Sequence, residues 1–123
     1  MSAPLAVIIE DETDLADIFA AALEAAGFAT EQIHNGLLAI ERLDQLEPTL
    51  ILLDLHLPGV DGSHVLAHIR ADERLRRCRV LLTTADAAYA NVLEKDAYLV
   101  LLKPISFSQL RDLARRLNPG ERA

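Results

Sequence analysis

Continuous apolar runs constrain the fold of this chain more than any other feature of its sequence. Strong runs lie at Leu5–Ile9, Leu50–Leu53, Val80–Leu82 and Tyr98–Leu102, and a weaker candidate covers Phe28–Ile33. In the four strong runs every residue is apolar, not every second one. This pattern is typical of parallel β-strands that are covered on both faces of a sheet.

The segments between these runs have the spacing of amphipathic helices. The first follows the i, i+3, i+4 pattern through Leu15, Ile18, Phe19, Ala22 and Ala26. Further helices are expected around residues 37–46, 65–69, 92–93 and 110–117, the fourth helix being short. Strand and helix alternate five times, which predicts an α/β fold with a five-stranded parallel sheet and helices on both faces. We expect one domain over residues 1–123.

Composition and charge narrow the class of protein. Of the 123 residues, 51% are hydrophobic and 25% are charged, as expected of a globular domain. Twelve basic and 19 acidic residues give a net charge of −7, which argues against nucleic acid as the main ligand. The single cysteine, the lack of a basic leader and the shortness of every apolar run predict a cytoplasmic protein that does not enter a membrane.

Acidic residues stand where two of the predicted strands end. Glu10 and Asp11 follow the first strand, and Asp54 follows the third. In an open parallel sheet, ligands bind at the carboxyl ends of the strands, where the strand order reverses. A strand order of 2-1-3-4-5 sets the first and third strands side by side, so the three acids would share one cleft. Neighbouring carboxylates repel unless a cation joins them, and Mg²⁺ is the natural partner.

A hydroxyl and an ammonium group are expected at the same edge of the sheet. Thr83 and Thr84 end the fourth strand, and Lys103 follows the fifth. Strand periodicity leaves open which threonine faces the acids. A hydroxyl, an ammonium group and a metal around one carboxylate are what a phosphoryl group there would need. Lys103 is one of two lysines against ten arginines, which indicates that this position needs a compact charge.

Each of these features also has a simpler interpretation. Glu10 and Asp11 could be acids of the first turn of a helix that begins near Thr13. Lys103 alone could be a solvated strand end, and Asp61-Gly62 is interpreted as a turn. The joint placement of the acids and the lysine favours the site.

Four motifs resemble those of the receiver domains of two-component response regulators. Val7–Glu12 resembles the acidic pair of the first strand, and Leu50–Gly62 resembles the phosphoacceptor strand with its loop. Val80–Ala85 resembles the hydroxyl motif, and Lys103-Pro104 the lysine of the fifth strand. The motifs occur in order and at compatible spacing over essentially the whole chain.

The resemblance implies a metal site beside a phosphoacceptor. Asp54 would accept the phosphoryl group and would also be a Mg²⁺ ligand. Asp11 would bind Mg²⁺ directly and Glu10 would bind it through water. The backbone carbonyl of His56 would be the remaining protein ligand.

The resemblance also implies partners for the phosphoryl group. Thr84, favoured over Thr83 because the small residue Ala85 follows it, would bind a phosphoryl oxygen. Lys103 would pair with Asp54 and with the phosphoryl group. A cis peptide bond is expected between Lys103 and Pro104.

The function implied by this family is phosphorelay signalling. A histidine kinase or histidine phosphotransfer protein would supply the phosphoryl group. An unknown downstream protein would then bind the phosphorylated domain. The chain would catalyse at most its own phosphorylation and dephosphorylation, as a monomer or weak homodimer. The alternative is an adaptor of the same fold whose partner binding ignores phosphorylation. A phosphatase is disfavoured, because His56 stands where a second acid would be needed.

Two features concern how a signal would leave the site, and a third concerns how long a phosphoryl group would stay on Asp54. Val100 stands where the family often has an aromatic side chain, and Tyr98 is no obvious substitute. The segment before the fifth strand is short, which predicts a shortened fourth helix. His56 and Asp86 each lie two residues after a site residue, and we expect them to approach one another across the site mouth.

Overall fold

Strands and helices alternate along the whole described chain. The structure is a computed structural model, which describes residues 3–120 apart from the side chain of Glu94. The strands are β1 (Leu5–Ile9), β2 (Ala29–Ile33), β3 (Leu50–Asp54), β4 (Arg79–Thr84) and β5 (Leu99–Leu102). The helices are α1 (Thr13–Ala25), α2 (Gly36–Leu43), α3 (Gly62–Ala71), α4 (Ala87–Leu93) and α5 (Phe107–Leu117), with 3₁₀ turns at Glu73–Leu75 and Glu94–Asp96.

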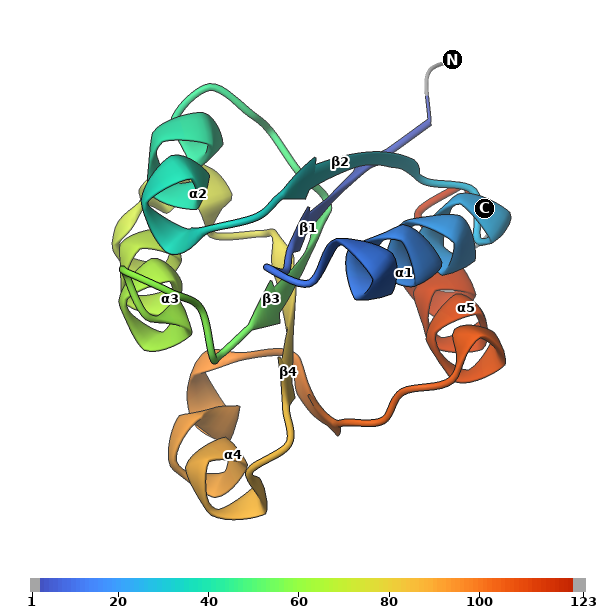
Figure 1. The fold of residues 1–123 in the computed structure, drawn as a ribbon. Coiled ribbons are helices and arrows are strands. Elements are labelled where there is room, and N and C mark those ends of the chain that lie inside the picture. The colour runs from blue at the N-terminus through green and yellow to red at the C-terminus, as the bar shows by residue number, and fades with distance from the viewer. Residues whose placement is uncertain (1–2, 121–123) are drawn as a thin grey trace.

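The five strands form one parallel sheet in the order β2-β1-β3-β4-β5, which confirms the predicted fold. α1 and α5 cover one face, and α2, α3 and α4 cover the other (Figure 1). Asp54 pairs with Thr83 across β3 and β4, and Thr84 pairs with Leu102 across β4 and β5. This register brings the carboxyl ends of four neighbouring strands to one edge.

Burial on both faces explains why the apolar runs are continuous. On β1, Ala6 and Ile8 pack toward α1 and α5, whereas Val7 and Ile9 pack toward α2 and α3. β3 repeats this alternation, and all five of its residues are buried. Each apolar residue of β1 and β3 therefore packs into one of two cores.

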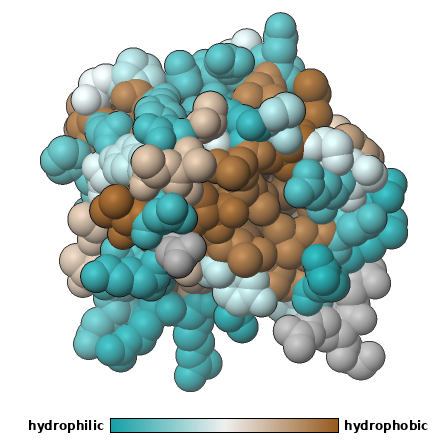
Figure 2. Space-filling view, turned by 90° about the horizontal axis from the view of Figure 1, so that it is seen from below, coloured by the Kyte–Doolittle hydropathy of each residue, from teal (hydrophilic) through white to brown (hydrophobic). Residues whose placement is uncertain are grey.

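The fifth strand departs from the expectation of burial on both faces. β5 is an edge strand, and Leu99 and Leu102 keep 40% and 51% of their surface exposed. α4 has only seven residues, so the fourth helix is short as predicted and covers little of this edge. Figure 2, which views the molecule from below, shows a broad apolar area on the side where β5 and its connection to α5 lie.

The loop from β3 to α3 depends on a glycine at its end. A Cβ atom at Gly62 would collide with the backbone carbonyl oxygen of Asp54 and with the Cα atom of Leu55. Gly62 also donates its N–H to the Leu55 carbonyl over 3.2 Å. α3 can begin this close to the end of β3 only because residue 62 has no side chain.

We therefore expect Gly62→Ala to destabilise the protein by about 1–3 kcal/mol, the usual range for an overpacked backbone contact. Urea unfolding followed by circular dichroism would measure the change. Helix propensity alone favours alanine by about 1 kcal/mol, so a more stable variant would contradict this close approach.

Candidate functional site

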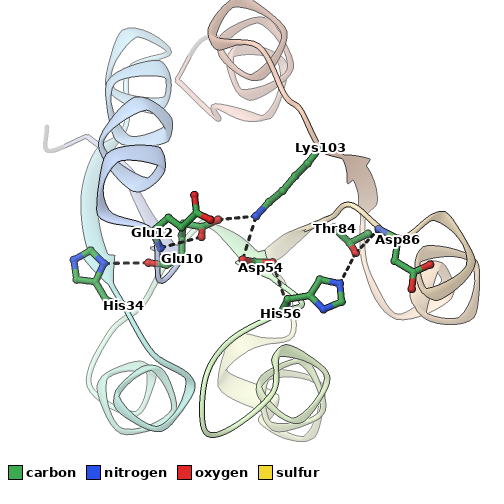
Figure 3. A network of polar contacts seen from close by, with 8 residues as sticks. All are labelled: Glu10, Glu12, His34, Asp54, His56, Thr84, Asp86 and Lys103. Carbon is green, nitrogen blue, oxygen red and sulfur yellow. Dashed lines mark hydrogen bonds and ion pairs between the residues drawn. The ribbon is translucent and has the colours of Figure 1, made fainter.

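The polar residues predicted to form a site lie together at the carboxyl edge of the sheet (Figure 3). Glu10 follows β1, Asp54 is the last residue of β3, Thr84 is the last residue of β4, and Lys103 follows β5. Because these four strands are neighbours and parallel, their ends meet without any long loop.

Three carboxylates form the acidic part of the site. Oxygens of Glu10, Asp11 and Asp54 all lie within 4.8 Å of one another. Glu10 and Asp54 are buried, with 2% and 3% of their surface exposed, whereas Asp11 is exposed. Mg²⁺ holds oxygen ligands at about 2.0–2.1 Å, so two ligands of one ion are separated by at most roughly 4.2 Å. The donor type fits such an ion, and the 4.8 Å limit on the spacing is only slightly wider than this span.

Lys103 joins the two buried carboxylates. Its Nζ atom lies 3.1 Å from Glu10 Oε1 and 3.2 Å from Asp54 Oδ2. Burial lowers the pKa of Lys103, but the charges of Asp54 and Glu10 and their hydrogen bonds with Lys103 together raise it more, so the pKa lies above its ordinary value. The peptide bond that follows Lys103 is cis, as the family resemblance implies.

One ammonium group does not fully compensate two buried carboxylates. Burial raises the pKa of Glu10 from 4.5 to about 7, and the negative charge of Asp54 adds to the shift. Hydrogen bonds from the Glu12 backbone N–H and from Lys103 oppose it. The site therefore has an excess of negative charge, which a divalent cation would neutralise.

This raised pKa predicts how stability depends on pH in the metal-free protein. Between about pH 4.5 and 7 the folded state holds a proton on Glu10 that the unfolded state has lost. The stabilising contribution of Glu10 is therefore complete below about pH 4.5 and is lost as the pH rises through about 7. In urea unfolding with EDTA across this range, the free energy of unfolding should fall more steeply with rising pH in wild type than in Glu10→Gln.

The matched control is Glu47→Gln, which removes an exposed acid far from the cluster. The free energy of unfolding of this control should change with pH as steeply as that of wild type. Equal slopes in wild type and Glu10→Gln would contradict the raised pKa.

The two threonines at the end of β4 have different surroundings. Thr84 Oγ1 accepts a hydrogen bond from the Asp86 backbone N–H over 3.0 Å and lies 2.9 Å from Nε2 of His56. Among the described side chains, the hydroxyl of Thr83 is buried without a hydrogen-bond partner. The choice of Thr84 stays a prediction, but its hydroxyl is the one on the His56 side of the cluster (Figure 3).

His56 contacts the site through both its backbone and its side chain. Its backbone N–H donates to Asp54 Oδ1 over 3.0 Å, while its ring reaches Thr84. The carboxylate of Asp86 accepts from the backbone N–H groups of Ala88 and Tyr89 and so caps α4. The expected approach of His56 to Asp86 is therefore replaced by a contact of His56 with Thr84, because the first turn of α4 engages Asp86.

The simpler interpretations are partly right. Glu10 Oε2 accepts from the backbone N–H of Glu12, just before α1, so this acid does serve the start of a helix. The interpretation of Asp61 as a turn residue was wrong. Asp61 is the N-cap of α3, with its carboxylate accepting from the Ser63 backbone N–H over 3.2 Å.

Two residues near the site were not predicted from the sequence. Nδ1 of His34 lies 3.0 Å from the backbone carbonyl oxygen of Glu10. His34 directly follows β2, so its position at a strand end was an available signal. The hydroxyl of Tyr89 donates to Asp61 Oδ2 over 3.0 Å, and no pattern in the sequence indicates this pairing of α4 with the start of α3.

Comparison with known proteins assigns the chain to a family. The sequence model of the response regulator receiver domain matches residues 6–115. The chain belongs to this family. Receiver domains are signalling domains of two-component systems, and the order of motifs along this chain agrees with that assignment.

Relatives and solved structures agree with the family. The DNA-binding dual master transcriptional regulator RpaA of Synechocystis is 40% identical over 82 residues, which are 67% of this chain and 34% of RpaA. The chain thus spans about a third of the length of that relative. The expectation that nucleic acid is not the main ligand stays a prediction.

Two solved structures illustrate the shared fold. Chemotaxis response regulator CheY4 of Vibrio cholerae superposes with a TM-score of 0.85 at 18% identity, over 94% of this chain and 99% of that chain. The receiver domain of sensor histidine kinase PA1611 from Pseudomonas aeruginosa has a TM-score of 0.83 at 24% identity, over 94% and 98% of the two chains. That structure has a magnesium ion coordinated in its active site cleft. Separately, none of the helices within residues 3–120 is long and apolar enough to cross a membrane.

Proposed function

We propose that this receiver domain accepts a phosphoryl group on Asp54 from a phosphohistidine donor, with Mg²⁺, and signals by protein contact. The observation that carries the proposal is the pair of buried carboxylates held by one lysine beside an exposed third acid. Asp54 accepts a backbone N–H from His56, as Glu10 does from Glu12, and Asp54 is the one that ends the strand beside β4 and its threonines. The donor would be a histidine kinase or a histidine phosphotransfer protein.

The transfer would be a single displacement at phosphorus. An oxygen of the Asp54 carboxylate forms a bond to phosphorus while the bond from phosphorus to the donor imidazole nitrogen breaks. The electron pair of that bond returns to this nitrogen, and the imidazole leaves as a neutral group because its other nitrogen already carries a proton. Lys103 neutralises charge on the phosphoryl oxygens, and the Thr84 hydroxyl donates to one of them.

The acids would hold the metal on the other side of Asp54. Asp11, Asp54 and the backbone carbonyl of His56 would be direct ligands, and Glu10 would bind through water. The ion, when bound, supplies positive charge against both the carboxylates and the phosphoryl oxygens. Asp11 is exposed, so the site is open to solvent on the side where a donor protein would approach.

Incubation with acetyl phosphate and Mg²⁺, followed by intact-mass measurement, tests the chemistry. Wild type should gain the mass of one phosphoryl group, because within residues 3–120 Asp54 is the carboxylate that lies among acids, a hydroxyl and a lysine. Asp54→Asn should gain none.

The control is the exposed acid Asp14, which lies in the first turn of α1 outside the cluster. Asp14→Asn should be labelled as wild type is. Labelling of Asp54→Asn, or labelling of wild type in EDTA, would overturn the assignment.

Mg²⁺ should also stabilise the fold, because it binds a cluster that exists only in the folded state. At ten times its dissociation constant the gain is about 1.4 kcal/mol by mass action, which thermal unfolding would detect. Asp11→Ala should relieve the repulsion among the acids and lose this response, whereas Asp14→Ala should keep it. NaCl at matched ionic strength separates binding from screening. An equal rise in melting temperature with NaCl would contradict a metal site.

A further inference from the structure

The hydroxyl proposed to bind the phosphoryl group is already engaged in this structure. Thr84 Oγ1 accepts the Asp86 backbone N–H, and the second group at this oxygen is Nε2 of His56. A hydroxyl has one proton to donate. If Nε2 accepts that proton, a phosphoryl oxygen on Asp54 must compete with His56 for it.

The ring of His56 has a second neighbour, on α4. The centroids of the His56 and Tyr89 rings lie 5.8 Å apart, and the ring planes are tilted by 59°. This is a normal separation for an aromatic pair. Tyr89 is half-buried and packs against the core between the sheet and the helices α2 and α3, whereas His56 is exposed. A displacement of the His56 ring would therefore change the packing of Tyr89.

Tyr89 in turn reaches the start of α3. Its hydroxyl donates to Asp61 Oδ2, the same oxygen that accepts from the Ser63 backbone N–H and from the Ser63 hydroxyl over 2.7 Å. Asp61 is the N-cap of α3. Contacts thus run without interruption from Thr84 on β4 to the first turn of α3.

The fifth strand offers no comparable route. Val100 has a short, stiff side chain and pairs with Leu82 on β4. Tyr98 precedes β5 at the amino end of that strand, the end opposite Thr84, and the Arg79 guanidinium lies 4.6 Å from the centre of its ring. Neither residue is placed to follow a movement of the Thr84 hydroxyl.

We propose that His56 and Tyr89 form a relay that carries the phosphorylation state of Asp54 to the first turns of α3 and α4. The relay rests on the proposed function, because the phosphoryl group is what draws Thr84 away. In the unphosphorylated protein, His56 carries its proton on Nδ1, and Nε2 accepts from the Thr84 hydroxyl. His56 is thus a positioning residue that acts through Thr84.

A charged acceptor decides the direction of the switch. Hydrogen bonds to an ionised group are roughly twice as strong as those between neutral groups, so the phosphoryl oxygen takes the Thr84 proton from His56. The released His56 ring leaves Tyr89, and the Tyr89 hydroxyl loses its fixed position at Asp61. A partner protein would distinguish the two states at the first turns of α3 and α4.

Amide NMR with and without beryllofluoride and Mg²⁺ tests the relay, since beryllofluoride stands in for the phosphoryl group on Asp54. Wild type should show shift changes at residues 61–65 as well as at residues 54–58 and 84–90. In Tyr89→Phe, which keeps the ring and removes the hydroxyl, the changes at 61–65 should fall to less than half, while those at 54–58 stay. The matched control, Tyr98→Phe, should behave as wild type.

Two further measurements address His56 directly. Long-range nitrogen–proton spectra of the unphosphorylated protein should show the proton on Nδ1. His56→Ala should accept phosphoryl from acetyl phosphate roughly two- to tenfold faster, the factor expected for one neutral hydrogen bond. His56→Gln, whose amide can still reach Thr84, should restore the slower rate. In a Thr84→Val background the His56→Ala change should have no effect.

The outcomes separate the relay from the function on which it rests. Shift changes confined to residues 54–58 and 84–86 in loaded wild type would overturn the relay and leave the proposed function in place. Three other results would also overturn the relay alone. They are unreduced shift changes at residues 61–65 in Tyr89→Phe, a proton on Nε2 of His56, and an effect of His56→Ala that persists without the Thr84 hydroxyl. Failure of wild type to gain phosphoryl mass would overturn both.

Discussion

Two carboxylates buried at the end of a parallel sheet, with one ammonium group between them, are the interaction on which this structure depends. Glu10 and Asp54 are almost fully buried, and Lys103 contacts both. Breaking a buried ion pair by removing one partner usually costs about 3–5 kcal/mol, because a charge stays buried without compensation. The folded structure therefore keeps two carboxylates and one ammonium group together at the end of the sheet. The excess negative charge favours the binding of a cation there.

The fold supplies what this cluster needs. Both faces of β1 and β3 are packed, so the strand ends are held rigidly and the carboxylates cannot turn out to water without disrupting a core. The missing side chain at Gly62 lets α3 begin against the end of β3. One short loop thereby carries the backbone N–H of His56 to Asp54 and the Asp61 cap to α3.

The same close packing determines which side chains contact one another around Thr84. Asp86 caps α4 and gives its backbone N–H to Thr84, so the ring of His56 meets the threonine and not the acid. Tyr89, in the first turn of α4, then lies between His56 and Asp61. Movement at the site is thereby connected to helix starts on the α3 and α4 side of the sheet, away from the exposed edge strand β5.

The sequence alone determined the alternation of strands and helices, the two-sided core and the set of polar strand ends, because periodicity of burial and position at a strand end are local properties of a chain. The strand order 2-1-3-4-5 was a premise that the structure confirmed. The sequence also indicated Glu10, Asp11, Asp54 and Lys103 as one cluster. It could not determine which atoms around Thr84 meet, since residues 56, 84 and 89 lie on three separate segments. Nor could it show that β5 would stay half-exposed or that Asp61 would cap a helix and hold Tyr89. Those outcomes depend on how closely the helices pack against the sheet, which only the tertiary structure decides.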